Sequence, residues 1–455
     1  MLSNTHDIAV DQTDQLHAFL VQMFQDLQSL IEQRIKAHFS NETLPIALEE
    51  PYRFPQGHAI SPLLEDCPLC LADYYMIALS LAPHIQPQWL DAIISANISG
   101  DSNFLELGGQ RGKQFRGMIP TGETVLFLLA GNDLSKRLQV QKHFHPDYWL
   151  NRKRVLYLAS VEEGEPQMAG KLILSQEYQD ILTQGYVTPP RFSLSFPAQR
   201  IETALEWEDL VLNPKTIAHI RDLETWVNHH QTLMEDWGMK RKLKPGYRVL
   251  FHGPPGTGKT LTASLLGKYT GKDVYKIDLS MIVSKFIGET EKNLSNLFAR
   301  AENKDWILFF DEADALFGKR TQVRDAHDKY ANQEVSYLLQ RVETYNGLVI
   351  LATNFKNNID EAFIRRFHGV IHFPLPASDE RQKLWEAAFP PQIQLSPEVD
   401  FANLAQKYEL SGAEIMNIMQ YCCLRSLENG NQSLKEATIL QGIRREYLKE
   451  GRIMR

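Results

Sequence analysis

The stretch that decides the fold is Gly253-Pro254-Pro255-Gly256-Thr257-Gly258-Lys259-Thr260, which fits the phosphate-binding loop G-x-x-x-x-G-K-[ST]. Its glycines allow successive backbone N–H groups to turn inward around an anion, and the helix that follows directs its positive N-terminal end at the same charge. The run Tyr247-Arg248-Val249-Leu250-Phe251 predicts a buried strand, and residues 261–268 predict a helix. The sequence therefore predicts a nucleoside triphosphate site between a strand and a helix.

Two side chains of this loop have defined tasks in such a site. Lys259 is expected to reach the β- and γ-phosphate oxygens as a point charge, and the hydroxyl of Thr260 is expected to ligate Mg²⁺. The predicted nucleotide-binding set runs from residue 253 to Leu261, at the start of the helix, and includes Asp311. The expected cofactors are ATP and Mg²⁺.

A second strand ends in two acids. The run Ile307-Leu308-Phe309-Phe310 is fully apolar and is followed by Asp311 and Glu312. In a parallel sheet, this arrangement places a carboxylate at the carboxyl edge, beside the bound phosphates. We expect Asp311 to hold the Mg²⁺ shell and Glu312 to act as the catalytic base that polarises the attacking water. Without the phosphate loop, the same pair would be interpreted as a solvated strand end.

A third strand, residues 348–353, ends at Asn354, whose amide is expected to orient the same water. It is followed by Asp360-Glu361-Ala362-Phe363-Ile364-Arg365-Arg366-Phe367. With these residues the chain resembles the AAA ATPases in the narrow sense, the group of katanin, spastin and the membrane-fusion ATPases, over about residues 205–450. The resemblance implies a ring, expected to be a hexamer, in which Arg365 and Arg366 act as catalytic cations on the nucleotide of the neighbouring subunit. The alternative is that the two arginines are surface residues that balance the charges of Asp360 and Glu361.

The same family carries a loop that faces a central channel and grips polypeptide with an aromatic side chain. Lys285, Phe286, Ile287 and Gly288 stand where that loop should lie. Phe286 is the expected gripping residue, because an exposed ring buries area against almost any side chain. The alternative is an aromatic residue of the core.

The pattern of elements divides the chain into four parts. Residues 1–190 are expected to form a mainly helical, possibly winged-helix-like domain for a client or partner, with strands near residues 155–161 and 171–174. The proline-bearing stretch from Thr188 through Pro197 has no periodicity and marks a domain boundary, and residues 191–204 are the expected linker. Strands and helices alternate in residues 205–376, which predicts a parallel α/β sheet covered on both faces. Residues 377–455 are expected to be a helical lid, with capping boxes at Ser411 and Ser433.

The front end of the chain resembles a narrower group. Residues 120–131, together with Gly318-Lys319-Arg320-Thr321 and Asp325-Ala326-His327-Asp328, resemble the bacterial AAA ATPases encoded with phage-tail-like contractile injection systems. This resemblance implies a role in assembling, loading or recycling such a particle.

Composition limits the other partners. The chain has 455 residues and a formal net charge of −8, so no overall basic field attracts nucleic acid or anionic lipid. Its longest apolar runs are too short to cross a bilayer, and a cytoplasmic protein is expected. Cys67 and Cys70 have the gap of a zinc knuckle, but Cys422 and Cys423 are adjacent, and neither His143 nor His145 has a second ligand set at sensible spacing. We therefore expect core cysteines and no zinc site.

The sequence thus favours an ATP-driven remodeller of protein clients. Two other classes of function stay open: an assembly switch, in which ATP binding builds a scaffold and hydrolysis resets it slowly, and a DNA-handling ATPase. The water-activating set of Glu312, Asn354 and the two arginines favours the enzyme, because a pure scaffold does not need it.

Overall fold

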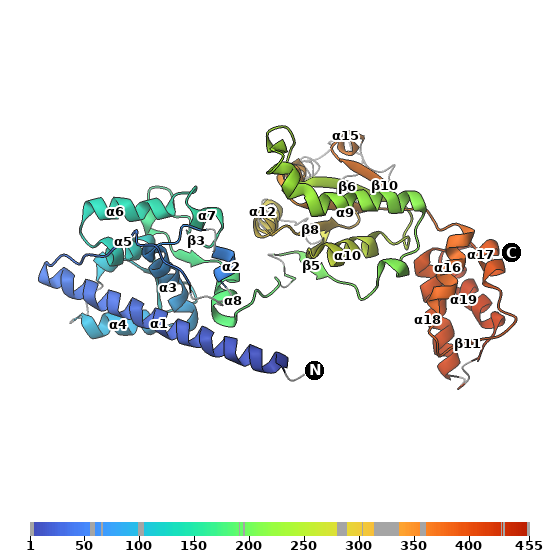
Figure 1. The fold of residues 1–455 in the computed structure, drawn as a ribbon, viewed down its shortest axis with the longest axis horizontal. Coiled ribbons are helices and arrows are strands. Elements are labelled where there is room, and N and C mark those ends of the chain that lie inside the picture. The colour runs from blue at the N-terminus through green and yellow to red at the C-terminus, as the bar shows by residue number, and fades with distance from the viewer. Residues whose placement is uncertain are drawn as a thin grey trace. The chain divides into compact units, whose positions relative to one another are not determined.

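The computed structural model describes residues 4–54, 60–64, 67–98, 104–190, 192–193, 196–279, 289–302, 304–313, 336–354, 361–428, 430 and 433–452. It divides the chain into two compact units, residues 1–189 and 190–455 (Figure 1). Within the described residues, no helix is both long enough and apolar enough to cross a membrane.

The first unit is mainly helical, as predicted. Its helices and strands are α1 (Asn4–Ser40), α2 (Ser61–Leu64), α3 (Leu71–Ile85), α4 (Trp89–Asn97), η1 (Leu105–Leu107), β1 (Gln110–Arg111), β2 (Met118–Ile119), α5 (Gly122–Ala130), α6 (Leu134–Gln141), η2 (Lys142–Phe144), α7 (Trp149–Arg152), β3 (Leu156–Leu158), η3 (Gln167–Ala169), β4 (Leu172–Leu174) and α8 (Gln176–Gln184). The antiparallel pair β3 and β4 confirms the predicted hairpin. The winged-helix interpretation stays a prediction.

The long helix α1 is held by its own unit. It packs against α3, α4, α5 and α8 (Figure 1). The side chains of Met23, Leu27 and Ile31 recur at four-residue steps and are almost fully buried. Burying a side chain of this kind contributes about 1.5–3 kcal/mol. The apolar face of the described part of α1 therefore has its partner inside the unit.

A buried carboxylate ties three elements of this unit together. Asp73 in α3 is fully buried. Its side chain accepts hydrogen bonds from the backbone N–H of Cys70 at 3.2 Å, the Tyr148 hydroxyl at 3.0 Å and the Trp149 indole at 3.1 Å, and Nδ1 of His143 lies 2.8 Å away. The fold thus brings Cys70 and His143 to the same carboxylate, which their sequence spacing did not indicate. Sγ of Cys70 also donates to Oδ2 of Asp73 at 3.4 Å. Because these donors fill the hydrogen-bonding capacity of the carboxylate, we interpret the cluster as a structural hub.

The second unit carries a six-stranded sheet in the order β10-β6-β9-β8-β7-β5. Its strands are β5 (Ala198–Ile201), β6 (Tyr247–His252), β7 (Val274–Ile277), β8 (Ile307–Phe310), β9 (Leu348–Thr353) and β10 (Gly369–His372). All neighbouring pairs are parallel except β5 with β7. Strands β8 and β9 are buried along their whole length, as their uninterrupted apolar sequences predict.

Helices cover both faces of the sheet. One face packs against α9 (Pro214–Met234) and α10 (Lys259–Thr270). The other packs against α12 (Glu289–Ala301) and the helical residues 336–344 (Figure 1). The second unit also contains the short elements η4 (Trp207–Asp209), η5 (Met239–Arg241) and α15 (Glu361–Ile364). This architecture confirms the predicted α/β P-loop fold.

Strand β5 differs from the sequence expectation, because it lies within the expected linker. Its residues Gln199 and Arg200 are exposed, so the strand has no apolar run that would identify it. It pairs with the edge of β7, where one side of the strand faces water. The linker is thus partly an edge strand of the sheet.

The end of the chain is a small helical group. It contains α16 (Ser378–Ala388), β11 (Gln394–Leu395), α17 (Phe401–Lys407), α18 (Gly412–Glu428), β12 (Ser433–Leu434) and α19 (Glu436–Lys449). The capping box at Ser411 is confirmed by its two reciprocal hydrogen bonds with Glu414. The prediction of a capping box at Ser433 is wrong. Ser433 belongs to strand β12 and pairs with Gln394 of β11, and the helix begins only at Glu436.

Candidate nucleotide-binding site

The phosphate loop connects β6 to α10, and its glycines have conformations that other residues rarely adopt. Gly256 has φ +75° and Gly258 has φ +94°. A β-carbon on Gly253 would lie 1.9 Å from the carbonyl oxygen of Phe373, and one on Gly258 would lie 2.8 Å from Leu210. Backbone packing and backbone conformation therefore both require glycine here. The following helix starts at Lys259, so its N-terminal N–H groups face the loop.

Lys259 links the loop to the end of β9. Its side chain is only 7% exposed. The ammonium Nζ donates to the carbonyl oxygens of Gly253 and Pro254 at 2.7 and 2.8 Å, and to Oδ1 of Asn354 at 3.0 Å. Two residues that the sequence selected from different strands are thus in direct contact. An ammonium held at the loop by two backbone carbonyl oxygens and one amide oxygen can bind a phosphate oxygen.

The helical lid contacts the loop directly. The backbone N–H of Ala413 donates to the carbonyl oxygen of Gly256 at 3.2 Å. A β-carbon on Gly256 would lie 2.7 Å from Cβ of Ala413 and 2.8 Å from Oγ of Ser411. The capping box that starts α18 therefore rests on the phosphate loop. The sequence marked Ser411 as a helix start but contained no signal for this contact.

The two acids follow β8 at the carboxyl edge of the sheet. Asp311 accepts a hydrogen bond from the backbone N–H of Glu312 through Oδ1 at 3.0 Å, and its Oδ2 lies 2.7 Å from Nζ of Lys276 in β7. Glu312 is exposed and has φ +52°, a left-handed conformation that is uncommon for a residue with a side chain. Such conformations cluster at functional sites and cost about 1–3 kcal/mol each.

The oxygen-bearing residues fit Mg²⁺ by their chemistry. Mg²⁺ prefers oxygen ligands and is usually bound through one or two protein groups together with phosphate oxygens. Thr260 lies in the first turn of α10 and supplies a hydroxyl, while Asp311 supplies a carboxylate. Leu261, the last residue of the predicted set, is half-buried in the same turn. These are the residues that would hold the metal and the nucleotide phosphates.

The two arginines lie away from the phosphate loop of their own chain. Arg365 and Arg366 are exposed and precede β10, which is parallel to β6, so they lie toward the amino edge of the sheet. The loop lies at the carboxyl edge. Arg366 forms an ion pair with Glu343 at 2.7 Å, whereas for Arg365 no ion pair is found among the described residues.

Lys285, Phe286, Ile287 and Gly288, the expected gripping loop, lie outside the described residues. Lys276, by contrast, was missed by sequence reasoning. A lysine on a strand edge has no distinctive spacing, and only the pairing of β7 with β8 brings it to Asp311.

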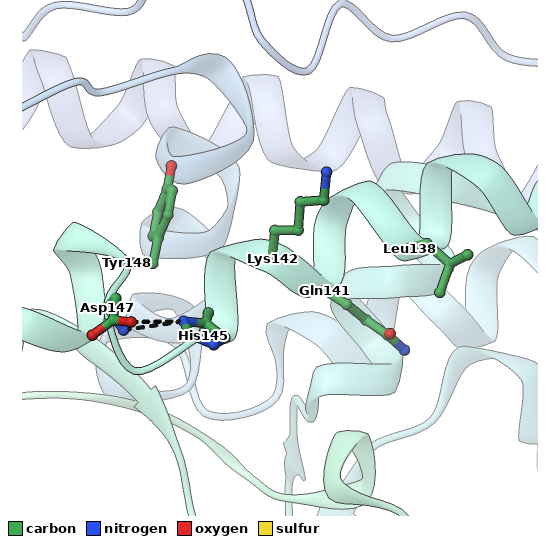
Figure 2. A pocket seen from close by; sticks show the side chains of 6 residues that line it. All are labelled: Leu138, Gln141, Lys142, His145, Asp147 and Tyr148. Carbon is green, nitrogen blue, oxygen red and sulfur yellow. Dashed lines mark hydrogen bonds and ion pairs between the residues drawn. The ribbon is translucent and has the colours of Figure 1, made fainter.

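A surface hollow of the first unit has no comparable chemistry. Figure 2 shows its lining side chains, which are Leu138, Gln141, Lys142, His145, Asp147 and Tyr148. The Tyr148 hydroxyl donates to Asp73 rather than serving the hollow. Nδ1 of His145 lies 3.5 Å from Oδ2 of Asp147, with 66% and 94% of their side chains exposed. The hollow is therefore ordinary polar surface.

Comparison with known proteins finds relatives of the second unit. Residues 249–375 match the family "ATPase family associated with various cellular activities (AAA)". The chain is 35% identical over 184 residues to proteasome-activating nucleotidase 2 of Halobacterium salinarum, covering 39% of this chain and 44% of that protein. It is 31% identical over 217 residues to a 26S proteasome regulatory subunit 6B homolog of Aspergillus niger, covering 46% and 51%.

A further relative is a katanin p60 ATPase-containing protein of Rattus norvegicus, 33% identical over 198 residues, which cover 40% of each chain. The matched region thus spans about half of these relatives or less. Residues 249–375 thus match an AAA ATPase domain, and the ligands of this family are ATP and Mg²⁺.

Proposed function

We propose that this chain is an ATP-driven remodeller of protein clients, in which the AAA ATPase domain hydrolyses ATP and passes the resulting movement to a bound polypeptide. The observation that carries the proposal is the contact between Lys259 in the phosphate loop and Asn354 at the end of β9. It joins the nucleotide-binding loop to the sheet edge that also bears Asp311 and Glu312.

Each residue at this edge of the sheet has its own proposed role in hydrolysis. When bound, Mg²⁺ supplies positive charge that neutralises the phosphate oxygens as charge develops on them. Lys259 binds and orients the phosphates, and Thr260 and Asp311 hold the metal shell. Glu312 accepts a proton from the attacking water at its carboxylate, and the amide of Asn354 orients that water. The left-handed backbone of Glu312 supports this role, because it fixes the direction in which the carboxylate leaves the strand end.

The ring belongs to the same proposal. Arg365 and Arg366 lie at the edge of the sheet opposite their own phosphate loop, so they serve hydrolysis only if they reach the nucleotide of another copy. A delocalised guanidinium meets the charge that builds on the transferring phosphoryl group. We propose a hexameric ring with one such contact at each interface between neighbouring copies.

The client side of the proposal rests on two parts of the chain. The first unit is proposed to bind the client or its adaptor, and Lys285, Phe286, Ile287 and Gly288 are proposed to grip the polypeptide in the channel. The names of the relatives support this direction, since two of them belong to proteasomal systems. A role for this ring with a phage-tail-like contractile injection particle is a narrower proposal, and it rests on the sequence resemblance alone.

The test is Glu312→Gln in the full chain. We expect ATP turnover to fall by at least about 100-fold, because the water loses its base. The affinity for ATP should stay within about twofold, since Lys259, Thr260 and Asp311 are unchanged. Steady-state phosphate release and equilibrium nucleotide binding measure the two quantities.

The matched control is Glu302→Gln, which removes a charge from a partly exposed ion pair with Arg341 beyond α12 and should leave turnover unchanged. If Glu312→Gln hydrolyses ATP within about threefold of the parent, the role of the carboxylate is worth less than about 1 kcal/mol and the assignment of the base is wrong. A parent chain that binds ATP without turnover would instead favour the assembly switch.

A further inference from the structure

The carboxylate proposed to hold Mg²⁺ already has a cationic partner in its own chain. Nζ of Lys276 lies 2.7 Å from Oδ2 of Asp311. The other oxygen, Oδ1, accepts the backbone N–H of Glu312 at 3.0 Å. Both oxygens of Asp311 are thus engaged, and a metal ion that approaches this carboxylate has to share it with the ammonium or displace it.

The strand places Lys276 on the side of the sheet where the metal is needed. Side chains alternate along β7: Tyr275 and Ile277 pack into the core beside α12, whereas Val274 packs against the α10 face. Lys276 is two residues after Val274 and therefore belongs to the α10 face. The first turn of α10 carries Thr260, the other expected ligand of the metal.

A divalent cation can displace the Lys276 ammonium from the Asp311 carboxylate. The side chains of Lys276 and Asp311 are 40% and 27% exposed, so water screens their attraction. Mg²⁺ carries twice the charge of an ammonium and arrives together with phosphate oxygens that complete its shell. The lysine has a flexible stem, so it can leave Asp311 without a change in the strand.

We propose that Lys276 is a positioning residue that holds the Asp311 carboxylate in the absence of metal. Its ammonium competes with Mg²⁺ for this carboxylate. Lys276 therefore raises the Mg²⁺ concentration at which the nucleotide binds tightly. This inference rests on the proposed function, because it assigns Lys276 to the same ATP site. It gives the chain a means to balance the charge of the Asp311 carboxylate between nucleotides. It also couples metal entry to the release of one internal cation.

The test measures the binding of a fluorescent ADP analogue to the full chain while Mg²⁺ is titrated from an EDTA-buffered start. Two neutral variants, Lys276→Met and Lys276→Gln, should lower the Mg²⁺ midpoint by about fivefold, the factor that corresponds to a partly exposed ion pair. Lys276→Arg keeps the charge and should stay within about twofold of the parent. Binding in EDTA alone reports any direct effect of the charge on the nucleotide and is subtracted from the comparison.

The matched control is Lys272→Met. Lys272 pairs with Asp305 at 2.8 Å just before β7, at the opposite edge of the sheet, and should leave the midpoint unchanged. Midpoints of both neutral variants at or above the parent value overturn the proposal, as does disagreement between the two variants. A parent chain whose ADP binding does not respond to Mg²⁺ contradicts the proposed function as well, whereas unchanged variants of a responsive parent contradict only the role of Lys276.

Discussion

At the scale of single residues, the site is shaped as much by glycines as by charges. Gly256 lies where the phosphate loop meets the lid, with φ +75° and no room for a β-carbon beside Ser411 and Ala413. The backbone N–H of Ala413 also donates to the Gly256 carbonyl oxygen. The residue therefore carries two constraints at once: the conformation of the loop and the contact that connects the lid to it.

We predict that Gly256→Ala weakens ATP binding by at least about tenfold, because the methyl group strains the loop and separates it from the lid. The control is Gly271→Ala, at the other end of α10. Gly271 has φ +65° but nothing within 4 Å of a β-carbon, so the change should cost about 1–2 kcal/mol of stability and leave nucleotide affinity intact. Equal affinities in the two variants, measured by calorimetry, would show that the lid contact does not serve the nucleotide.

At the scale of elements, the central strands with mainly apolar sequences were predicted well and the edge strand β5 was not predicted. β6, β8 and β9 lie where the sequence predicts them, because burial on both faces leaves a long apolar run. β5 was missed because an edge strand needs no such run. The Asp73 hub was missed for a different reason, since its donors come from residues 70, 143, 148 and 149 and only packing brings them together.

We predict that Asp73→Ala destabilises the first unit by about 3 kcal/mol, because it leaves the buried indole N–H of Trp149 and the N–H of Cys70 without an acceptor. Hydrogen–deuterium exchange of peptides from α3 and α7 should accelerate accordingly. Asp147→Ala is the control, because that side chain is 94% exposed beside His145 (Figure 2) and its loss should leave the same peptides unchanged. Similar exchange in both variants would argue against the hub.

The pKa values of two cysteine thiols depend on the elements that surround them. Burial raises the pKa of Cys422 to about 12, and burial together with the neighbouring Asp73 raises the pKa of Cys70 to about 11. Both groups are therefore held as neutral thiols at physiological pH and are poor nucleophiles. Cys422 is fully buried, as expected of a core cysteine, whereas Cys70 is half-buried at the start of α3.

At the scale of the whole molecule, the two units have separate cores, and the nucleotide site lies entirely in the second. The proposed reaction needs more than one copy of this unit. The phosphate loop lies at one edge of the sheet and Arg365 and Arg366 lie toward the other, so a single copy does not assemble the full set.

We predict that Arg365→Ala and Lys259→Ala chains are each inactive alone and recover part of the turnover when mixed. In a random equal mixture, about a quarter of the interfaces combine an intact loop with an intact arginine from its neighbour. Phosphate release is measured after the two variants have exchanged copies, which a fluorescence transfer assay confirms. Complete lack of recovery in mixed assemblies would mean that the arginine acts within its own copy or only holds structure.

The sequence by itself determined the phosphate loop, the acids after β8, the asparagine after β9 and the α/β class of the second unit. These features are local: each needs a residue type at a fixed position along one strand or turn, so it is visible in the chain itself. The tertiary structure alone decided which side chains share a site. Lys276 reaches Asp311, Ser411 and Ala413 rest on Gly256, and Asn354 accepts from Lys259 only because parallel strands and the lid bring distant segments to one edge. Contacts of this kind depend on strand order and packing, which no spacing along the chain encodes.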